Sequence, residues 1–262
     1  MRILITNDDG INAPGLKVAE ALAADLAGPD GEIWVVAPAM EQSAVSHCVS
    51  YIRPMRMEQW EKRRFIVEGS PADCILAALG DIMTDTPPDL VLSGVNRGHN
   101  VAEDVIYSGT VAGAMEAALH GIKSIALSQY YGPGNIRLDD TFEAARANAL
   151  PICRKLIESA IWHDETYEVF YNLNFPACPA AEVKGIKTTH QGKRPEPPFR
   201  VQAQPAPNGR KYYWLTHGGV GNAGAEQGTD ARETQDGYVT VTPLRAEMTA
   251  NAALPRLTEL FG

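Results

Sequence analysis

Short apolar runs alternate with helix-like patterns along most of the chain. The runs predict buried strands, and apolar residues at helical spacing between them predict amphipathic helices. The expected strands cover residues 2–6, 32–37, 90–93, 124–128 and 169–174, and the expected helices cover residues 15–27, 71–83, 110–120 and 138–162. This alternation is typical of an α/β fold with a Rossmann-like, doubly wound and mostly parallel sheet.

One excursion interrupts this alternation. Two short strands, at residues 48–57 and 64–67, are expected to pair antiparallel. The helix that follows has Ser70 as its expected N-cap, because a serine hydroxyl accepts a hydrogen bond from the first helical turn. Pro71 then occupies the first helical position, where proline is tolerated.

After residue 190 the composition changes, and glycine, proline and aromatic residues become frequent. Residues 211–216 predict an aromatic strand, and Asn208-Gly209 is a strong signal for a hairpin turn. A strand at 238–242 and a helix at 250–261 close the chain. The expected parts are an α/β core at 1–190, a projecting C-terminal β-hairpin arm at 191–237, and a closing strand and helix at 238–262. Such an arm favours a homodimer or homotetramer.

Composition narrows the classes of partner. The chain has 262 residues, 45% of them hydrophobic, and a formal net charge of -9. An acidic surface argues against binding to a nucleic-acid duplex, although a small anionic substrate remains open. The four cysteines are widely spaced, which favours free thiols over disulfides or a zinc site. With no membrane-length apolar run and a strand beginning at residue 2, we expect a cytoplasmic protein without membrane contact.

The most informative polar residues are Asp8 and Asp9, which end the first predicted strand. In open α/β folds, the carboxyl ends of the strands hold the ligands. Two adjacent carboxylates repel each other, and a hard divalent cation between them relieves that repulsion. The alternative is an ordinary solvated Asx turn, in which Gly10 adopts a positive φ angle.

Three further polar loops follow strand ends and should gather at the same edge. The loop after the second strand carries Ser43, and the loop after residue 93 carries Asn96 and Asn100. The run Ser108-Gly109-Thr110 opens a helix, where backbone N–H groups and hydroxyls can hold a phosphate. The alternative for Ser108 is a simple N-cap. Together, the oxygen-rich side chains suit Mg²⁺ or Mn²⁺ beside a phosphate-sized anion.

Two charged residues near this edge have open roles. Arg97 either holds an anion or pairs with Asp104 or Glu103. His99 is a candidate acid for the leaving group, although most single loop histidines serve no such role.

The absence of several known catalytic motifs argues against the reactions that depend on them. The chain contains no GxxxxGK[ST] and no GxGxxG, so neither ATP hydrolysis nor dinucleotide binding is indicated. It also lacks the G-x-S-x-G nucleophile elbow. The acidic pair is DD and not DxD, which argues against an aspartyl-phosphate mechanism. Metal-activated water is then the simplest nucleophile.

Five segments together resemble the SurE family of metal-dependent nucleotidases. They are ITNDDGINAPGL, APAMEQSAVSH, EGSPADC, PDLVLSGVNRGHN and DVIYSGTVAGAMEAALHGIKSIALS. The resemblance covers about half of the chain and implies one divalent cation per subunit, Mg²⁺ or Mn²⁺. Its implied ligands are Asp8, Asp9, Ser43 and Asn96. Two departures, Met40-Glu41-Gln42 and His99, lie near the expected substrate mouth.

The resemblance also implies the substrate and the reaction. Nucleoside 5′-monophosphates are the expected substrates, with 3′-monophosphates left open, and the products are a nucleoside and phosphate. The implied phosphate contacts are Asn100, Ser108, Gly109 and Thr110, and Asp8 or Asp9 is the implied catalytic group. The family's dimers and tetramers form through a C-terminal hairpin.

The alternative function is a non-catalytic, Mg²⁺-dependent module that senses or binds phosphate or a nucleotide. Receiver domains also end their first strand on paired acids. A receiver needs a phosphoacceptor aspartate after its third parallel strand and a lysine after its fifth. The corresponding segments here, LVLSGVN and SIALSQ, contain neither.

Overall fold

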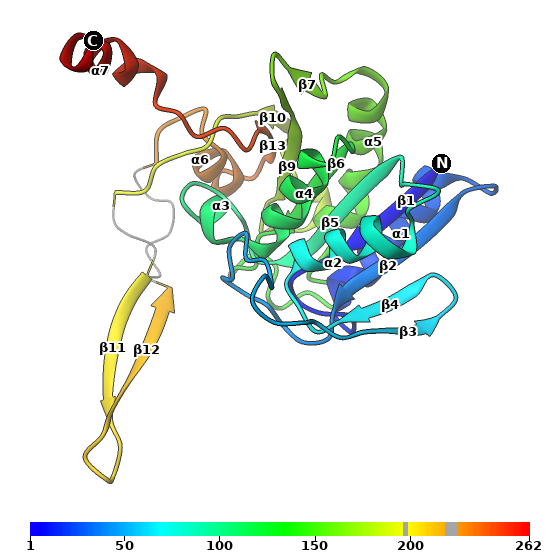
Figure 1. Ribbon diagram of the computed structural model, residues 1–262, viewed down its shortest axis with the longest axis horizontal. Helices are drawn as coiled ribbons and strands as arrows, with labels where there is room; N and C mark the ends of the chain where they lie inside the picture. The colour runs from blue at the N-terminus through cyan, green and yellow to red at the C-terminus, as the bar shows by residue number, and fades with distance from the viewer. Residues whose placement is uncertain (196–198, 218–224) are drawn as a thin grey trace.

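A computed structural model describes residues 1–195, 199–217 and 225–262. Within these residues nine strands form one sheet, flanked by helices (Figure 1). Across the sheet the strands are β10 (Ile186–Thr188), β13 (Val239–Leu244), β9 (Phe170–Phe175), β6 (Ser124–Gln129), β5 (Leu90–Arg97), β1 (Arg2–Thr6), β2 (Glu32–Pro38), β4 (Arg64–Val67) and β3 (Met57–Glu61). The expected Rossmann-like α/β sheet is confirmed.

Strand directions show that the sheet is doubly wound. From β9 through β6, β5, β1 and β2 to β4 every neighbouring pair is parallel. The antiparallel pairs are β9 with β13 and β3 with β4. The chain first builds outward from β1 through β2 to β4, and then returns to β5 on the other side of β1. The winding direction therefore reverses between β1 and β5, which is where open α/β sheets bind ligands.

Helices cover both faces of the sheet. On one face, α1 (Pro14–Ala27) and α5 (Glu143–Ser159) pack over side chains such as Ile5 and Leu92. On the other face lie α2 (Pro71–Ala77), its continuation as a π-helical turn (Ala78–Ile82), and α4 (Gly109–Leu119). Successive residues of a strand point to opposite faces, so strands covered on both sides are continuously apolar. This is why β1 reads as an unbroken apolar run.

The remaining elements are short or peripheral. They are α3 (Asp104–Tyr107), β7 (His163–Asp164), β8 (Tyr167–Glu168), a 3-10 turn (Ala180–Glu182), α6 (Asp230–Gln235), a second 3-10 turn (Asn251–Ala253) and α7 (Leu254–Phe261). Among the helices in the described ranges, none combines the length and apolar character needed to cross a membrane.

The expected hairpin consists of β11 (Phe199–Pro205) and β12 (Lys211–His217). It extends away from the sheet, and α7 projects separately near the C-terminus (Figure 1). Trp214 on the hairpin is 61% exposed, and Phe261 on α7 is 86% exposed. The division of the chain at residues 190 and 237 stays a prediction.

Two local expectations have different outcomes. The strand predicted at 48–57 is wrong, because residues 48–56 have no strand structure and β3 begins at Met57. Side-chain bonds hold this segment instead: the Ser50 amide and hydroxyl each donate to Asp73 at 2.8 Å. The Ser70 N-cap is confirmed, since its hydroxyl accepts from the Asp73 amide and its own amide donates to the Asp73 carboxylate.

The capping box predicts a measurable stability. Ser70→Ala removes the acceptor for the Asp73 amide and the donor to the Cys48 carbonyl. We expect the free energy of unfolding to fall by about 1–2 kcal/mol, as for other lost caps. Urea denaturation measures this, with Ser159→Ala at the exposed end of α5 as the control. Equal stability of the two variants would contradict the assignment.

Candidate active site

The polar loops predicted from the sequence meet at the point where the winding reverses. Asp8 and Asp9 follow β1, Asn96 lies near the end of β5, and the two strands are direct neighbours. A pocket of about 360 Å³ opens there. The candidate residues that line it are Asp8, Ser43, Asn96, Asn100 and Ser108. The remaining candidates are Thr110 and Gly109, which contact Asp8, and Asp9, which is its chain neighbour.

Asp8 is buried and bonded to the start of α4. The side chain is 4% exposed. One carboxylate oxygen accepts the Thr110 hydroxyl at 2.6 Å, and the other accepts the Thr110 amide at 3.1 Å. Burial is the largest influence on this group and raises its pKa to about 6, against the lowering effect of the Thr110 hydroxyl and with a further increase from Asp9. The strand end and the helix start therefore share one carboxylate.

Asp9 is less buried than Asp8 and faces the end of β5. Its carboxylate accepts the Arg97 backbone amide at 2.9 Å. Burial raises the pKa of Asp9, whereas the Arg97 amide and charge lower it. Within the described ranges the Arg97 guanidinium forms no ion pair, so neither of its two predicted acidic partners is observed.

The turn after β1 shares the positive φ angle of Gly10 with the alternative prediction, but neither the hydrogen bond of an Asx turn nor its solvation. The Asn7 side chain donates to the Gly10 carbonyl at 2.9 Å, and Gly10 has a φ angle of +97°. Because Asp8 is buried, a solvated turn does not describe this segment. Its two carboxylates are held where water cannot fully screen their repulsion.

Gly109 allows the helix start to approach Asp8. A Cβ atom at position 109 would lie 2.8 Å from the Asp8 Cβ and 3.2 Å from one Asp8 carboxylate oxygen. Real Cβ atoms do not approach other heavy atoms that closely, so a larger residue here would displace the strand end or the helix. The Ser108 hydroxyl accepts the Val111 amide at 3.0 Å, so Ser108 is the N-cap of α4 and also lines the pocket.

Ser43 and Asn96 both line the pocket. Ser43 is exposed and donates to the Glu41 carboxylate at 2.7 Å. The Asn96 side-chain nitrogen donates to the Gly98 carbonyl at 3.0 Å, so the local turn already uses it. A divalent cation would take the side-chain oxygen of Asn96, whose nitrogen is the donor, and a lone pair of the Ser43 hydroxyl oxygen, whose proton goes to Glu41.

Asn100 connects the pocket to the strand ends behind it. Its backbone N–H donates to the side-chain oxygen of Asn174 at 2.7 Å, and its side-chain nitrogen donates to the Ser128 hydroxyl at 2.8 Å. The Asn100 carbonyl accepts from the side chains of Asn172 and Asn174. These bonds fix the Asn100 side chain at the edge of the pocket before any ligand arrives.

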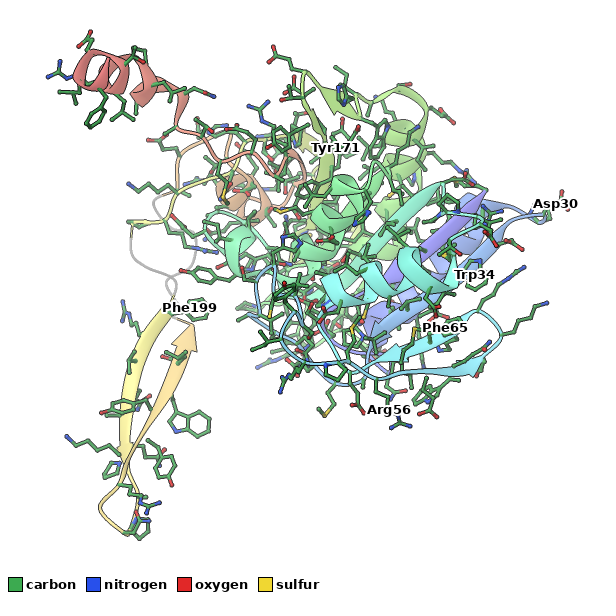
Figure 2. The ribbon with its side chains drawn as sticks, in the orientation of Figure 1. Asp30, Trp34, Arg56, Phe65, Tyr171 and Phe199 are labelled. Carbon is green, nitrogen blue, oxygen red and sulfur yellow. The ribbon has the colours of Figure 1, made fainter. Side chains whose placement is uncertain are left out.

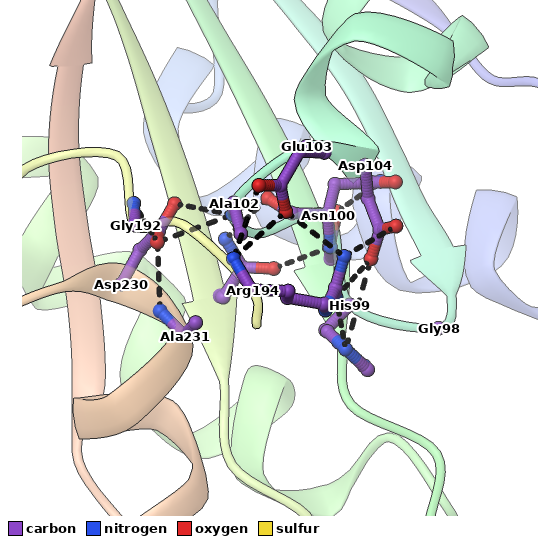
Figure 3. Close-up of polar contacts among 12 residues, drawn as sticks. Gly98, His99, Asn100, Ala102, Glu103, Asp104, Gly192, Arg194, Asp230 and Ala231 are labelled. Atoms are coloured by element: carbon purple, nitrogen blue, oxygen red, sulfur yellow. Dashed lines mark hydrogen bonds and ion pairs between the residues drawn. The ribbon is translucent and has the colours of Figure 1, made fainter. Parts of the chain in front are cut away.

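Arg194 is a component of the site that the sequence analysis did not identify. Its guanidinium is almost completely buried and contacts both carboxylate oxygens of Asp104, at 2.7 and 2.5 Å (Figure 3). It also lies 3.3 Å from His99 Nε2. Asp104 and His99 line the pocket. The sequence around Arg194 has no periodic pattern, so only the fold reveals the pairing.

Asp230, the first residue of α6, forms hydrogen bonds to the loop after β5 and to the segment that carries Arg194. Its carboxylate accepts the backbone amides of Ala102, Gly192 and Ala231 (Figure 3). Burial raises the pKa of Asp230 to about 6, although the three amides lower it. The loop after β5 and the segment that carries Arg194 are thus joined through one buried carboxylate.

The donor set fits a hard divalent cation. Among the residues that the structure describes, no three histidine, cysteine, aspartate or glutamate side chains form a metal-binding group. The candidate set consists of two carboxylates, a hydroxyl and an amide, and all-oxygen sets of this kind suit Mg²⁺ or Mn²⁺. The desolvated charge of Asp8 and Asp9 is what such a cation would neutralise.

Comparison with known proteins identifies the family of this chain. The family model for survival protein SurE matches residues 3–196. The chain belongs to the SurE family. A Cereibacter sphaeroides protein named 5′-nucleotidase SurE is 54% identical over 262 residues, which is 100% of both chains. A protein of the same name from Ruegeria pomeroyi is 53% identical over 98% of both chains.

A solved structure extends the likeness to the SurE fold. The crystal structure of the Sure protein from Aquifex aeolicus superimposes with a TM-score of 0.81. It is 36% identical in sequence, and each chain covers 100% of the other. The match includes the chain beyond residue 196, where the SurE family model ends.

The close approach at Gly109 predicts a stability effect. Gly109→Ala forces a methyl group against Asp8, and we expect the free energy of unfolding to fall by about 1–3 kcal/mol, as in overpacked cores. Gly80→Ala is the matched control, because a Cβ atom there meets nothing within 4 Å. Urea denaturation of both variants tests this, and an undiminished stability of Gly109→Ala would show that the helix can move away.

The buried Asp8 predicts a pH dependence. In the folded protein its pKa is about 6, above its ordinary value of 3.8, so its contribution to stability is complete below about pH 3.8 and is lost as the pH rises through 6. Without metal, ionising it in the fold costs roughly 3 kcal/mol more than in water.

Asp8→Asn removes this cost. In EDTA, the free energy of unfolding of the variant minus that of the wild type should therefore increase between pH 4 and pH 7. Urea denaturation at several pH values gives this difference. The slope is the test, because lost bonds to Thr110 change the offset only, and a flat difference would contradict the burial argument.

Proposed function

We propose that this SurE family member is a divalent-metal-dependent phosphomonoesterase that hydrolyses nucleoside 5′-monophosphates to a nucleoside and phosphate. One observation carries the proposal: Asp8, in a buried acidic pair, accepts both polar groups of Thr110 at the start of α4. A cation site and an anion site thereby adjoin in one pocket. The name 5′-nucleotidase SurE, carried by relatives 53–54% identical over nearly their whole length, supports the same substrate class.

The proposed cation ligands are Asp8, Asp9, Ser43 and Asn96, for one Mg²⁺ or Mn²⁺ per subunit. When bound, the cation polarises a phosphoryl oxygen and lowers the pKa of water. Asp9 is the better acceptor for the proton of the attacking water. Among the residues that the structure describes, only one Asp9 oxygen accepts a hydrogen bond, whereas Asp8 uses both of its oxygens.

The proposed phosphate contacts are Asn100 and the run from Ser108 to Thr110. At the start of α4 the Thr110 amide is bonded to Asp8, and the Val111 amide to Ser108. Within the described ranges the backbone amide of Gly109 has no hydrogen-bond partner, so this N–H can donate to a phosphate oxygen. The helix dipole favours an anion at this end.

His99 does not suit the role of leaving-group acid through Nε2. A guanidinium can only donate hydrogen bonds, and Arg194 lies 3.3 Å from this atom. Nε2 therefore accepts, and hydrogen-bond chemistry assigns the proton to Nδ1. His99 lines the pocket, and the buried Arg194 holds Asp104 in place.

We further propose that the chain forms a homodimer or homotetramer through the hairpin arm. Tyr212, Tyr213, Trp214 and Leu215 on β12 are 57–71% exposed, and exposed aromatic clusters mark interaction surfaces. This role accords with the proposed division into a core at 1–190, an arm at 191–237 and a closing segment at 238–262.

The test is phosphate release from nucleoside 5′- and 3′-monophosphates with Mn²⁺, with Mg²⁺ and with EDTA. We expect release only with metal, and a loss on the order of 100-fold or more in Asp9→Asn, since the substitution removes a ligand and the proton acceptor. Asp25→Asn, an exposed position on α1, is the control.

Two outcomes would oppose the proposal. Metal-independent release would remove the role of the acidic pair. Metal-dependent nucleotide binding without turnover by folded protein would favour the non-catalytic module. The substrate panel also ranks 5′- against 3′-phosphates and one base against another.

A further inference from the structure

Aromatic residues line the pocket in addition to the acidic and polar ones. Tyr107, Tyr131 and Phe199 line the same 360 Å³ cavity as Asp8 and Ser108. Tyr107 directly precedes Ser108, the cap of α4, so its ring is attached next to the proposed phosphate site. The hydrogen bonds already described do not involve these rings.

Tyr107 and Phe199 form one packed unit, here named the aromatic wall. Their ring centroids are 5.0 Å apart and the rings are inclined by 84°, the edge-to-face arrangement that aromatic pairs prefer. Tyr107 remains 39% exposed, so part of its surface is available to a ligand. The Tyr107 carbonyl also accepts the Ser46 amide at 2.9 Å, which fixes its backbone to the loop that carries Ser43.

Phe199 reaches the pocket from a distant part of the sequence. It is the first residue of β11, at the end of the hairpin nearest the core (Figure 2). The remaining large hydrophobic residues of the hairpin, Val201 and Tyr212 to Leu215, are 57–71% exposed, whereas Phe199 is only partly exposed. Phe199, at the start of the hairpin, thus lines the ligand pocket, whereas the other residues of β11 and β12 do not.

We propose that the aromatic wall binds the nucleobase of the substrate by stacking or edge contact and makes the pocket selective for nucleotides over phosphorylated sugars. This inference rests on the proposed function. A nucleoside monophosphate has an anionic end and a flat aromatic end, and the pocket is lined both by a helix start and by aromatic rings. Because every base has a π-face, such contacts can form with any of the bases. They should favour the larger purines over the pyrimidines.

The experiment compares two substrates that differ only in the base. Adenosine 5′-monophosphate carries the ring, and ribose 5-phosphate lacks it. Phe199→Ala should lower kcat/KM for the nucleotide roughly 10- to 100-fold, mainly through KM, which corresponds to the loss of one base–aromatic contact. For ribose 5-phosphate it should change kcat/KM by less than about 2-fold. Phe199→Tyr keeps the ring and should restore activity on the nucleotide.

Trp60→Ala on β3 is the control, because it removes an exposed aromatic residue that lies outside the pocket and outside the proposed oligomer surface. It should leave the ratio of the two substrates unchanged. An equal loss for both substrates in Phe199→Ala would mean that Phe199 only supports the hairpin. An unchanged nucleotide rate would mean that the base lies elsewhere. Either result overturns the proposal.

A binding measurement separates this proposal from the proposed function. Adenosine, which has the base but no phosphate, is titrated by calorimetry into wild type and Phe199→Ala. Weaker binding to the variant supports the wall even if no substrate is turned over, whereas equal or absent binding overturns it. If neither phosphorylated substrate releases phosphate with metal, the nucleotidase proposal fails, whatever the adenosine result.

Discussion

The carboxylate of Asp8 is buried between the end of β1 and the start of α4, where Thr110 donates to both of its oxygens. This contact joins two segments that are far apart in the sequence, and it determines how closely the helix start approaches the strand end. Gly109 is required at the contact because a Cβ atom there would meet Asp8. The same burial raises the pKa of Asp8 to about 6. The site is thus built on a charge that the fold alone does not neutralise.

Such a charge creates the requirement for a cation. Desolvation and the neighbouring Asp9 both oppose ionisation of Asp8, while the Thr110 bonds favour it. A divalent ion held by the acidic pair would shift this balance, and its ligands would also face a helix N-terminus suited to an anion. In the proposed site, one side chain would therefore link metal binding to phosphate binding.

A second buried network connects the pocket to the C-terminal part of the chain. Arg194 binds Asp104 through both terminal nitrogens of its guanidinium. Asp230 accepts hydrogen bonds from backbone amides of two separate loops. Because bidentate arginine–carboxylate pairs fix orientation as well as distance, this network positions the rim of the pocket. Arg194 lies just before the hairpin whose root contributes Phe199, so the hairpin's placement and the pocket's shape share one support.

The sequence by itself determined the sheet and the position of the acidic pair. Apolar runs covered on both faces are hard to mistake, so the parallel strands and the helices between them were predicted, and Asp8 and Asp9 could be placed at a strand end. The rule that such ends share one edge brought Ser43, Asn96 and Ser108 together. The hairpin followed from Asn208-Gly209 and its aromatic strand, which are local signals.

Only the tertiary structure decided the contacts whose energy comes from distant partners. The segment at 48–56 has strand-like residues, but Ser50 bonds to Asp73 instead of to a neighbouring strand. Arg194 has no sequence pattern that marks it, because its partner Asp104 lies 90 positions away. Likewise, Thr110 could be predicted at a helix start, but its two hydrogen bonds to Asp8 depend on how the helix packs on the sheet. Periodicity reports burial along one element, whereas pairing depends on the relative placement of several.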